Sequence, residues 1–159
     1  MMSSNIEACH ACEGDAGEIA ALYIASRSDA LPYLHRVHTD VEVRGWIRDV
    51  VLKRGETWVV RKSGIIVGFL TLVGDEVDQL YVLPGHYRYG IGRQLLELAK
   101  KRSPERLYLY TFQRNARARV FYEAQGFRIV DTSDGSRNEE NEPDIRYEWT
   151  PSPSRAFSP

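Results

Sequence analysis

The sequence predicts one α/β domain in which a mixed β-sheet has helices on both faces. Two observations lead to this prediction. The chain has 159 residues, of which 43% are hydrophobic and 27% charged, as is typical of one soluble domain with a core of its own. Along the chain, segments with apolar residues at helical spacing alternate with short runs rich in β-branched and aromatic residues, an order typical of helices packed on a sheet.

Capping and turn residues give the boundaries of these elements. Asp15 with Glu18 and Thr39 with Glu42 each resemble a capping box that begins a helix, and Ser63-Gly64 is typical of a tight hairpin turn. In chain order the predicted elements are a strand 6–9, helices 15–26 and 39–51, strands 57–61, 65–73 and 77–83, a helix 90–102, a strand 107–112, a helix 115–125, and strands 127–130 and 145–149. We assign residues 5–150 to the domain and expect 151–159, rich in proline and serine, to be a disordered tail.

Charge and hydropathy narrow the range of partners. The 21 basic and 22 acidic side chains nearly cancel, so no overall field favours nucleic acid or an anionic membrane. The longest apolar stretch, Ile65 to Val73, has nine residues, whereas a membrane-spanning helix needs roughly 20. The first residues also lack the pattern of a secretory signal. We therefore expect a cytoplasmic protein without a membrane or nucleic-acid partner, and a homodimer is left open.

Cys9 and Cys12 form a Cys-x-x-Cys pair with two interpretations. The pair could serve redox chemistry or be half of a zinc site, but a structural zinc site usually has a second pair and a thioredoxin-like motif follows a strand at a helix start. The other interpretation is two reduced thiols near a strand end. We favour the second and predict no metal site.

The most informative stretch is Val77–Leu96, in which a strand leads through a short turn into a helix that begins with Gly90 and Gly92. A helix start of this kind exposes unpaired backbone amides and the positive end of the helix dipole, and glycines let a phosphate approach closely. The dinucleotide fingerprint would need a further glycine at Leu95, and the Gly-Lys-Ser/Thr of a Walker loop does not occur in the sequence. A lone Gly-x-Gly can also serve close helix packing.

Two segments together resemble the motifs of the GNAT superfamily of N-acetyltransferases. Val77–Leu96 resembles motif A, whose Arg/Gln-x-x-Gly-x-Gly/Ala binds the pyrophosphate of coenzyme A. Asn115–Phe127 resembles motif B, with an asparagine, a helix bearing a tyrosine, and Gly-Phe. The resemblance covers about Asn5 to Trp149. The chain also resembles a group of bacterial GNAT proteins. The resemblance implies a single GNAT domain with a mostly antiparallel sheet, acetyl-coenzyme A as co-substrate, and direct attack by a primary amine in a ternary complex.

The resemblance also implies which residues bind the co-substrate. The central strand is expected to be bulged and splayed near Tyr81 or Val82, so that backbone amides there bind the pantetheine arm and the developing oxyanion. The motif has one departure, because Tyr87 stands where Arg or Gln is usual, and Arg88 or Arg93 would then supply the charge. The predicted co-substrate-binding residues are Leu80, Tyr81, Val82, Tyr87, Arg88, Tyr89, Gly90, Ile91, Gly92, Arg93, Asn115, Phe121 and Tyr122.

Three residues are candidates for catalysis. An alkyl amine is mostly protonated at neutral pH, so a base must remove its proton. Glu76 and Asp78 lie two apart, on one face of a regular strand, and Glu76 is at a position where some GNAT members carry a glutamate. The alternative is that both are solvated residues at a strand start. Tyr122 matches the family tyrosine that protonates the leaving thiolate, although it and Phe121 could also be core aromatics.

The acceptor is expected over the first two helices and the last strand pair. Tyr33, His35 and His38 lie between the two helices and are predicted to line the acceptor pocket, with the histidines more typical of polar surface than of a metal site. The segment 131–144 is acidic and could attract a cationic amine, or simply be solvated. The acceptor would be a small molecule or a protein amino group.

Two other classes of function compete with an enzyme. A non-catalytic acyl-coenzyme A sensor would keep the phosphate cradle without a working base, and the departure at Tyr87 is consistent with it. A nucleic-acid-binding module could use Arg114, Arg117 and Arg119, but Arg117 and Arg119 cannot share one helical face. We rank the nucleic-acid module last.

Overall fold

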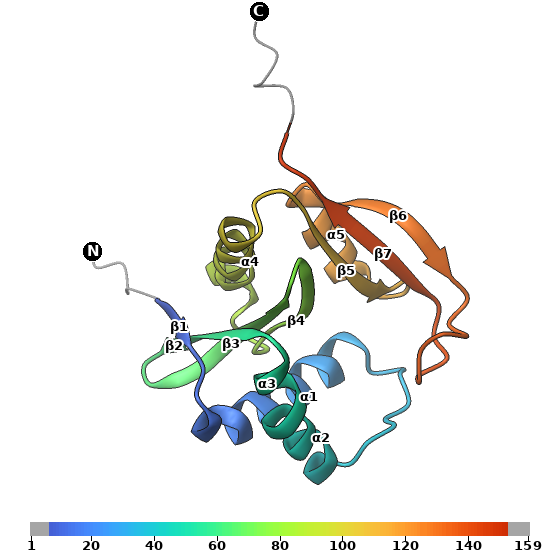
Figure 1. Cartoon of the computed structure of the whole chain (residues 1–159). Helices are drawn as coiled ribbons and strands as arrows, with labels where there is room; N and C mark the ends of the chain where they lie inside the picture. The colour runs from blue at the N-terminus through green and yellow to red at the C-terminus, as the bar shows by residue number, and fades with distance from the viewer. Residues whose placement is uncertain (1–6, 153–159) are drawn as a thin grey trace, which may run out of the picture.

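The computed structural model describes residues 7–152, which form one layered α/β unit (Figure 1). The strands are β1 (Ala8–His10), β2 (Glu56–Lys62), β3 (Ile65–Val73), β4 (Glu76–Val82), β5 (Leu107–Phe112), β6 (Arg128–Ser133) and β7 (Asp144–Trp149). The helices are α1 (Ala16–Ala30), α2 (Asp40–Trp46), α3 (Leu52–Arg54), α4 (Ile91–Arg102) and α5 (Ala116–Ala124), with short 3-10 turns η1 (Glu13–Asp15) and η3 (Tyr87–Tyr89). The segment η2 (Ile47–Val51), with π-helical hydrogen bonding, joins α2 to α3 in one continuous helix.

The sheet has seven strands in the order β1-β2-β3-β4-β5-β7-β6. All neighbours are antiparallel except β4 and β5, which run parallel. This confirms the predicted mixed and mostly antiparallel sheet. None of the helices within residues 7–152 has the length and apolarity that crossing a membrane would take.

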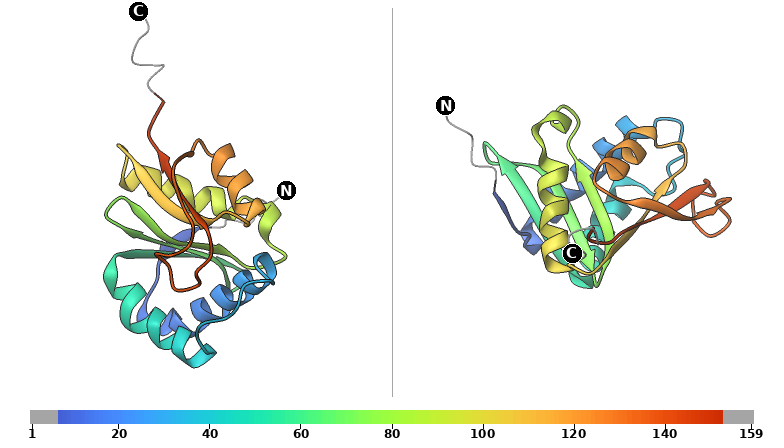
Figure 2. Two further views of the ribbon diagram at one scale, coloured as in Figure 1. Left: turned by 90° about the vertical axis from the view of Figure 1, so that its right-hand side faces the viewer. Right: turned by 90° about the horizontal axis from the view of Figure 1, so that it is seen from above.

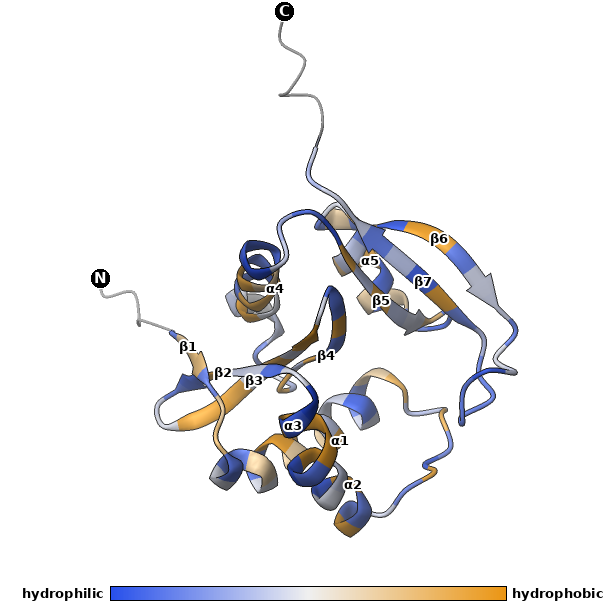
Figure 3. Cartoon of the chain, in the orientation of Figure 1, coloured by the Kyte–Doolittle hydropathy of each residue, from blue (hydrophilic) through white to orange (hydrophobic). Residues whose placement is uncertain are grey.

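Helices cover both faces of the sheet, as predicted (Figures 1 and 2). Successive side chains of a strand point to opposite faces, so Val59 and Phe69 pack with α1 and α2 whereas Val60 and Leu70 pack with α4. The apolar sides of the helices face the sheet and their polar sides face outward (Figure 3). Two hydrophobic clusters, one on each face, therefore hold the central strands in place.

Several predicted boundaries are confirmed, and one capping interaction is wrong. The Thr39 amide donates to the Glu42 carboxylate at 2.8 Å and the Glu42 amide to the Thr39 hydroxyl at 3.2 Å, a complete capping box. Asp15 instead accepts from the Cys12 amide at 2.9 Å, and Glu18 accepts from the Ile66 amide at 2.7 Å. The Glu18 carboxylate therefore links α1 to β3 instead of capping α1. The 3-10 turn η1 precedes α1, and Asp15 caps that turn.

The chain ends extend beyond the described residues. Asn5 and Ile6, at the predicted start of the domain and its first strand, and residues 153–159 of the predicted tail lie outside them. Pro151 and Ser152 have no regular secondary structure.

β4 is bulged and splayed, although the bulge lies earlier than expected. The pairing that the structure describes between β4 and β5 is limited to Glu76 opposite Tyr108, after which the two strands diverge (Figure 1). On the β3 side, Thr71 lies opposite Gln79 and Leu72 opposite Val77, so Asp78 is the extra residue of a β-bulge. The bulge was expected near Tyr81 or Val82. It bends β4 before that point, where the strand begins to leave β5.

A glycine of β3 allows α4 to pack directly on the sheet. A Cβ atom at Gly68 would lie 2.6 Å from Ile91 Cγ2 and 3.3 Å from Leu95 Cδ1. We expect Gly68→Ala to lower the free energy of unfolding by about 1–3 kcal/mol, the usual cost of overpacking a core. Urea unfolding measures this. Gly17→Ala in α1 is the control, because its Cβ meets nothing within 4 Å; equal stability of the two variants would contradict the packing argument.

Candidate functional site

The opening between β4 and β5 forms a groove of about 440 Å³. Its walls come from six parts of the chain: the end of α1, the strand β4, the strand β5, the start of α4 with the turn before it, α5, and the β6–β7 loop. Of the predicted site residues, it is lined by Asp78, Leu80, Tyr81, Val82, Tyr87, Gly90, Gly92, Arg93, Asn115, Phe121 and Tyr122. The fold thus brings most of the two motifs together around one cavity.

Main-chain groups of β4 face this groove. The backbone groups of successive residues in an antiparallel strand point to opposite neighbours. Because the Leu83 amide donates to the Val67 carbonyl on the β3 side at 2.8 Å, Tyr81 also faces β3, whereas Leu80 and Val82 face the side that β5 has left. Leu80 and Val82 are therefore better placed than Tyr81 to donate to a ligand in the groove.

The start of α4 offers a second set of main-chain donors. Gly90 has φ +71°, a left-handed conformation that L-residues rarely adopt, and a Cβ there would meet nothing within 4 Å. The first backbone bond of α4 runs from the Gln94 amide to the Gly90 carbonyl at 2.9 Å, so the amides of the first turn have no intrahelical acceptor. A diphosphate fits this position, since it can accept from those amides and lie at the positive end of the helix dipole.

The second motif glycine has a packing role. A Cβ at Gly92 would lie 3.3 Å from the Phe121 ring and 3.7 Å from Val82 Cγ2, so α5 and β4 approach α4 closely here. The packing interpretation thus fits Gly92, and the open space beside Gly90 fits the phosphate interpretation. Ile91 is fully buried, so its contribution to a ligand would come from its backbone.

α5 brings Tyr122 to the groove. Asn115 caps the helix by accepting from the Ala118 amide at 3.1 Å, as predicted. The Tyr122 ring contacts the rings of Phe121, Phe127 and Tyr147 at centroid distances of 5.2, 5.6 and 6.2 Å. Burial, with a smaller effect of Tyr81, raises the pKa of the Tyr122 hydroxyl. The hydroxyl therefore keeps its proton at neutral pH, as a proton donor must.

The two candidate bases have different surroundings. Asp78 lines the groove and its Oδ2 accepts from Arg54 at 2.6 Å. Glu76 is not among the groove-lining residues and accepts from the Tyr108 hydroxyl at 3.5 Å. Burial, and then the charge of Asp78, raises the pKa of Glu76. A raised pKa makes a carboxylate a better proton acceptor near neutral pH.

Three predicted residues lie in the turn before α4. The Tyr87 hydroxyl donates to Asp29 at 2.9 Å, and the Lys62 ammonium lies 3.8 Å from the centre of the Tyr89 ring. Arg93 lines the groove from the first turn of α4. Arg88 lies between Tyr87 and Tyr89 in the 3-10 turn η3, and its role in binding stays a prediction.

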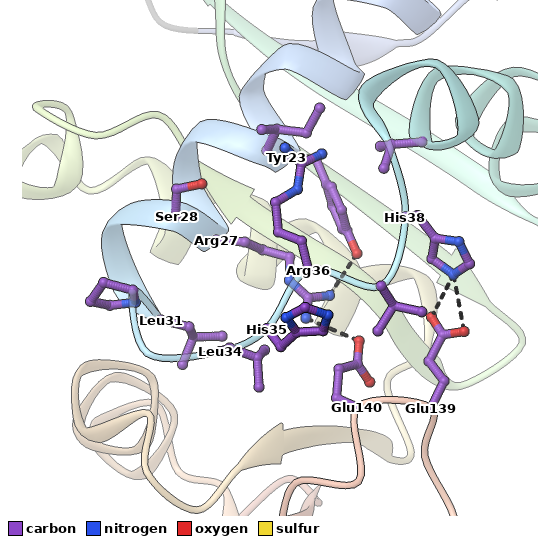
Figure 4. Close-up of a pocket in the computed structure, with 14 residues that line it drawn as sticks. Tyr23, Arg27, Ser28, Leu31, Leu34, His35, Arg36, His38, Glu139 and Glu140 are labelled. Atoms are coloured by element: carbon purple, nitrogen blue, oxygen red, sulfur yellow. Dashed lines mark hydrogen bonds and ion pairs between the residues drawn. The ribbon is translucent and has the colours of Figure 1, made fainter.

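A second pocket, of about 310 Å³, lies between α1, the segment that follows it and the β6–β7 loop (Figure 4). His35 and His38 line it. That this pocket takes the acceptor stays a prediction. Tyr33 lies elsewhere, with the Arg114 guanidinium 3.8 Å from its ring centre.

Arg27 and Glu140 separate this pocket from the groove. Both residues line both cavities, and they form an ion pair at 3.1 Å (Figure 4). Arg27 also donates to the Tyr23 hydroxyl at 2.6 Å. Burial alone would lower the pKa of Arg27, but the Tyr81 and Tyr23 hydroxyls and Glu140 raise it, so the guanidinium stays charged.

The acidic segment 131–144 is held against the rest of the domain. Its carboxylates Glu139 and Glu142 pair with His38 at 3.0 Å and with Arg114 at 2.7 Å. Together with the Glu140 pair, these contacts fix the β6–β7 loop over the second pocket (Figure 4). The loop therefore acts as a wall of that pocket.

The other candidate groups, Arg117 excepted, lie outside both cavities. Cys9 and Cys12 are free, exposed thiols near the end of β1. Within residues 7–152 no group of three or more His, Cys, Asp or Glu side chains is arranged to hold a metal ion. Of the three arginines considered for nucleic acid, Arg114 pairs with Glu142, Arg117 with Asp29, and Arg119 donates to the Gln113 carbonyl.

Comparison with known proteins finds similarity to one family in the part of the chain that forms this site. The profile of the acetyltransferase (GNAT) domain matches residues 53–129, which include β4, α4, β5 and α5. The peptidyl-lysine N-acetyltransferase YiaC of Escherichia coli (strain K12) is 37% identical over 86 residues, which are 54% of this chain and 58% of YiaC. The matches to curated relatives span from about half to just under two thirds of each relative's length, between 51% and 65%.

Solved structures have the same fold over nearly the whole chain. The solution structure of apo YjaB from Escherichia coli has a TM-score of 0.76 and 24% identity and covers 91% of this chain and 97% of YjaB. The PaiA N-acetyltransferase from Thermoplasma acidophilum, solved in complex with coenzyme A, has a TM-score of 0.68 and 21% identity and covers 94% of this chain and 99% of that one. At these identities the likeness is one of fold. In its domain profile, its two motifs around one groove and its fold, this chain is similar to the GNAT superfamily of acetyltransferases.

Proposed function

We propose that this chain transfers the acetyl group of acetyl-coenzyme A to a primary amine, by direct attack in a ternary complex. The observation that carries the proposal is the groove between β4 and β5, which is lined by residues of β4 and of the first turn of α4 that have free main-chain donors, and by Tyr122. The second pocket adjoins the groove through the Arg27–Glu140 ion pair. Two adjoining cavities can hold the co-substrate and the acceptor at the same time, as a ternary complex requires.

The main chain does most of the binding in this proposal. Acetyl-coenzyme A supplies an acetyl group activated as a thioester. The amides of Leu80 and Val82 hold the pantetheine arm and the acetyl oxygen in the opening of the sheet, and they stabilise negative charge that develops there. The first turn of α4 at Gly90 and Arg93 holds the diphosphate.

Tyr122 and a carboxylate of β4 move the protons. The amine nitrogen attacks the thioester carbonyl, and the Tyr122 hydroxyl donates its proton to the thiolate sulfur as the C–S bond breaks; the proton that the nitrogen loses on forming the amide returns to the tyrosine through water. The acceptor ammonium must first lose a proton, and Glu76 is the better candidate for this step because its pKa is raised, with water relaying the proton where it does not reach the amine. Asp78, held by Arg54, remains the other candidate.

The pH dependence distinguishes these carboxylates. Only a deprotonated Glu76 accepts a proton, so kcat/KM should fall as pH falls through its raised pKa. Asp78→Asn removes a charge that raises this pKa, so the acidic limb should move to lower pH. Glu76→Gln should lower kcat/KM about a hundredfold and remove that limb. Steady-state kinetics from pH 5 to 9 measures both, and an unchanged limb in Glu76→Gln would assign the base elsewhere.

The acceptor is proposed to be a lysine-type amine, on a protein or a small molecule. The curated relative YiaC is named a peptidyl-lysine N-acetyltransferase, which supports an alkyl amine. The second pocket is lined by both apolar and charged side chains, including Leu34, His35 and Glu140 (Figure 4). Such a lining suits an aliphatic chain that ends in a cationic group.

A thiol-release assay tests the proposal. The purified chain is incubated with acetyl-coenzyme A and a panel of amines that includes lysine peptides and small alkyl amines, and free thiol is followed. We expect amine-dependent release, with the acetylated amine found by mass spectrometry. Binding of acetyl-coenzyme A without turnover on any amine would instead identify an acyl-coenzyme A sensor, an alternative that the departure at Tyr87 keeps in view.

A further inference from the structure

We infer that Arg117 is a binding residue for the phosphates of coenzyme A, and that the Asp29 carboxylate pairs with Arg117 when no coenzyme A is bound. The inference rests on the proposed function, since it concerns the same groove. It starts from the residue that departs from the motif. Tyr87 carries no charge, and the residue that packs on it is an arginine from a different helix: the Arg117 guanidinium lies 4.5 Å from the centre of the Tyr87 ring.

Three residues from three elements meet at the edge of the groove. The Tyr87 hydroxyl donates to Asp29 Oδ2 at 2.9 Å, and Arg117 Nη1 donates to the same oxygen at 3.1 Å. Asp29 belongs to α1, Tyr87 to the turn before α4, and Arg117 to α5. Tyr87 and Arg117 line the groove together with Gly90. The contact therefore spans the end of the groove where the diphosphate is proposed to lie.

Both charges are in places that their own helices disfavour. Arg117 is the second residue of α5, at the positive end of the helix dipole, and Asp29 is the last residue but one of α1, at the negative end. Neither α4 nor α5 has an acidic residue in its first turn. The positive ends of α4 and α5 and the Arg117 guanidinium thus lie at this end of the groove. The carboxylate that pairs with Arg117 is Asp29 of α1.

A phosphate can readily displace the Asp29 carboxylate from Arg117. The side chains of Arg117 and Asp29 are 58% and 43% exposed, and exposed pairs of this kind contribute little to stability. A phosphate offers Arg117 two oxygens in the geometry that a guanidinium binds best, and carries more charge than a carboxylate. When phosphate takes Arg117, the Asp29 carboxylate must move away, because two anions at this distance repel each other.

The two residues therefore have opposite expected effects on binding. Arg117→Gln should weaken coenzyme A about tenfold, the usual result of losing one charge-assisted contact. Asp29→Asn should tighten coenzyme A severalfold, because the site no longer holds a competing carboxylate. Pantetheine, which has no phosphate, should compete for the groove equally well in the wild type and in Arg117→Gln.

The matched controls come from a second exposed ion pair. Arg48 and Asp49, in η2, pair at 2.8 Å with side chains 47% and 55% exposed and do not line the groove. Arg48→Gln and Asp49→Asn change the net charge in the same way and should leave the affinity within about twofold, because neither side chain lines the groove and exposed charges are screened by salt.

Calorimetric titration with coenzyme A, using the four variants and the wild type, tests the inference. Weaker binding by Arg117→Gln together with tighter binding by Asp29→Asn supports it. Equal affinity of Arg117→Gln and the wild type overturns the role of Arg117, and weaker binding by Asp29→Asn overturns the role of Asp29. No binding of coenzyme A by the wild type overturns the proposed function itself, so the two failures are distinct.

Discussion

Replacing Tyr122 with phenylalanine is expected to lower kcat about a hundredfold, because a positioned proton donor typically contributes 10²- to 10⁴-fold. The affinity for acetyl-coenzyme A should change little, since the hydroxyl acts on the sulfur mainly as the thiolate leaves. The fold should persist, because the ring keeps its contacts with Phe121, Phe127 and Tyr147. Steady-state kinetics with calorimetric binding separates the two quantities.

Tyr147 supplies a control from the same aromatic cluster. Its ring is fully buried and its hydroxyl donates to Glu123 at 2.6 Å, and it does not line the groove. Tyr147→Phe also removes one buried hydroxyl, so it should cost stability by about 1 kcal/mol and leave kcat nearly unchanged. Equal kcat in Tyr122→Phe and the wild type would remove Tyr122 from catalysis.

Gly90→Ala is expected to weaken acetyl-coenzyme A by about ten- to a hundredfold, which corresponds to the loss of one or two hydrogen bonds to a charged group. Gly90 has φ +71° and open space beside it on the wall of the groove. A methyl group there would occupy space next to the amides that the diphosphate approaches, and it would strain the left-handed backbone by about 1–2 kcal/mol. Calorimetry on the folded variant gives the affinity.

The control must be a glycine that has the same left-handed backbone conformation but does not line the groove. Gly74, between β3 and β4, has φ +62° and nothing within 4 Å of a Cβ, and it does not line the groove. Gly74→Ala should lose a similar amount of stability in urea unfolding and bind acetyl-coenzyme A like the wild type. If both variants bind equally well, Gly90 does not border the diphosphate.

The elements that the sequence predicted well are those with local signals. β5 has the predicted bounds, and the box of Thr39 and Glu42 is present because all of its atoms lie within one turn. Asp15 and Glu18 have the same spacing, but their carboxylates accept from the amides of Cys12 and Ile66 instead. A pattern of side chains cannot tell whether a carboxylate will accept from an amide of its own helix start or from an amide elsewhere in the fold.

Only those site residues that belong to a contiguous sequence motif could be predicted. Gly90, Asn115 and Tyr122 could be found because each belongs to a short motif, and the fold brings the motifs to one groove. The pairs Arg27–Glu140 and Asp29–Arg117 join residues 113 and 88 positions apart, and no local pattern marks them. These pairs depend on how α1 packs against the β6–β7 loop and α5, which the hydropathy pattern does not specify.

The location of the bulge shows the same limit. The resemblance to GNAT proteins predicted a bulged and splayed strand, and β4 has both features. The extra residue is Asp78 rather than one near Tyr81, because the bulge is set by the pairing of β4 with β3. As a result, Asp78 is itself the bulged residue, and the alternation that would place Glu76 and Asp78 on one face is interrupted.

The central claim is that main-chain donors of β4 and of the first turn of α4 hold the acyl-coenzyme A, and amide NMR of the 18.2 kDa chain tests it most directly. Titration of the ¹⁵N-labelled protein with acetyl-coenzyme A should saturate with the largest amide shifts at Leu80, Val82 and residues 90–93, while amides of the β6 edge stay in place. Saturation without shifts at these amides, or no binding, would contradict the account.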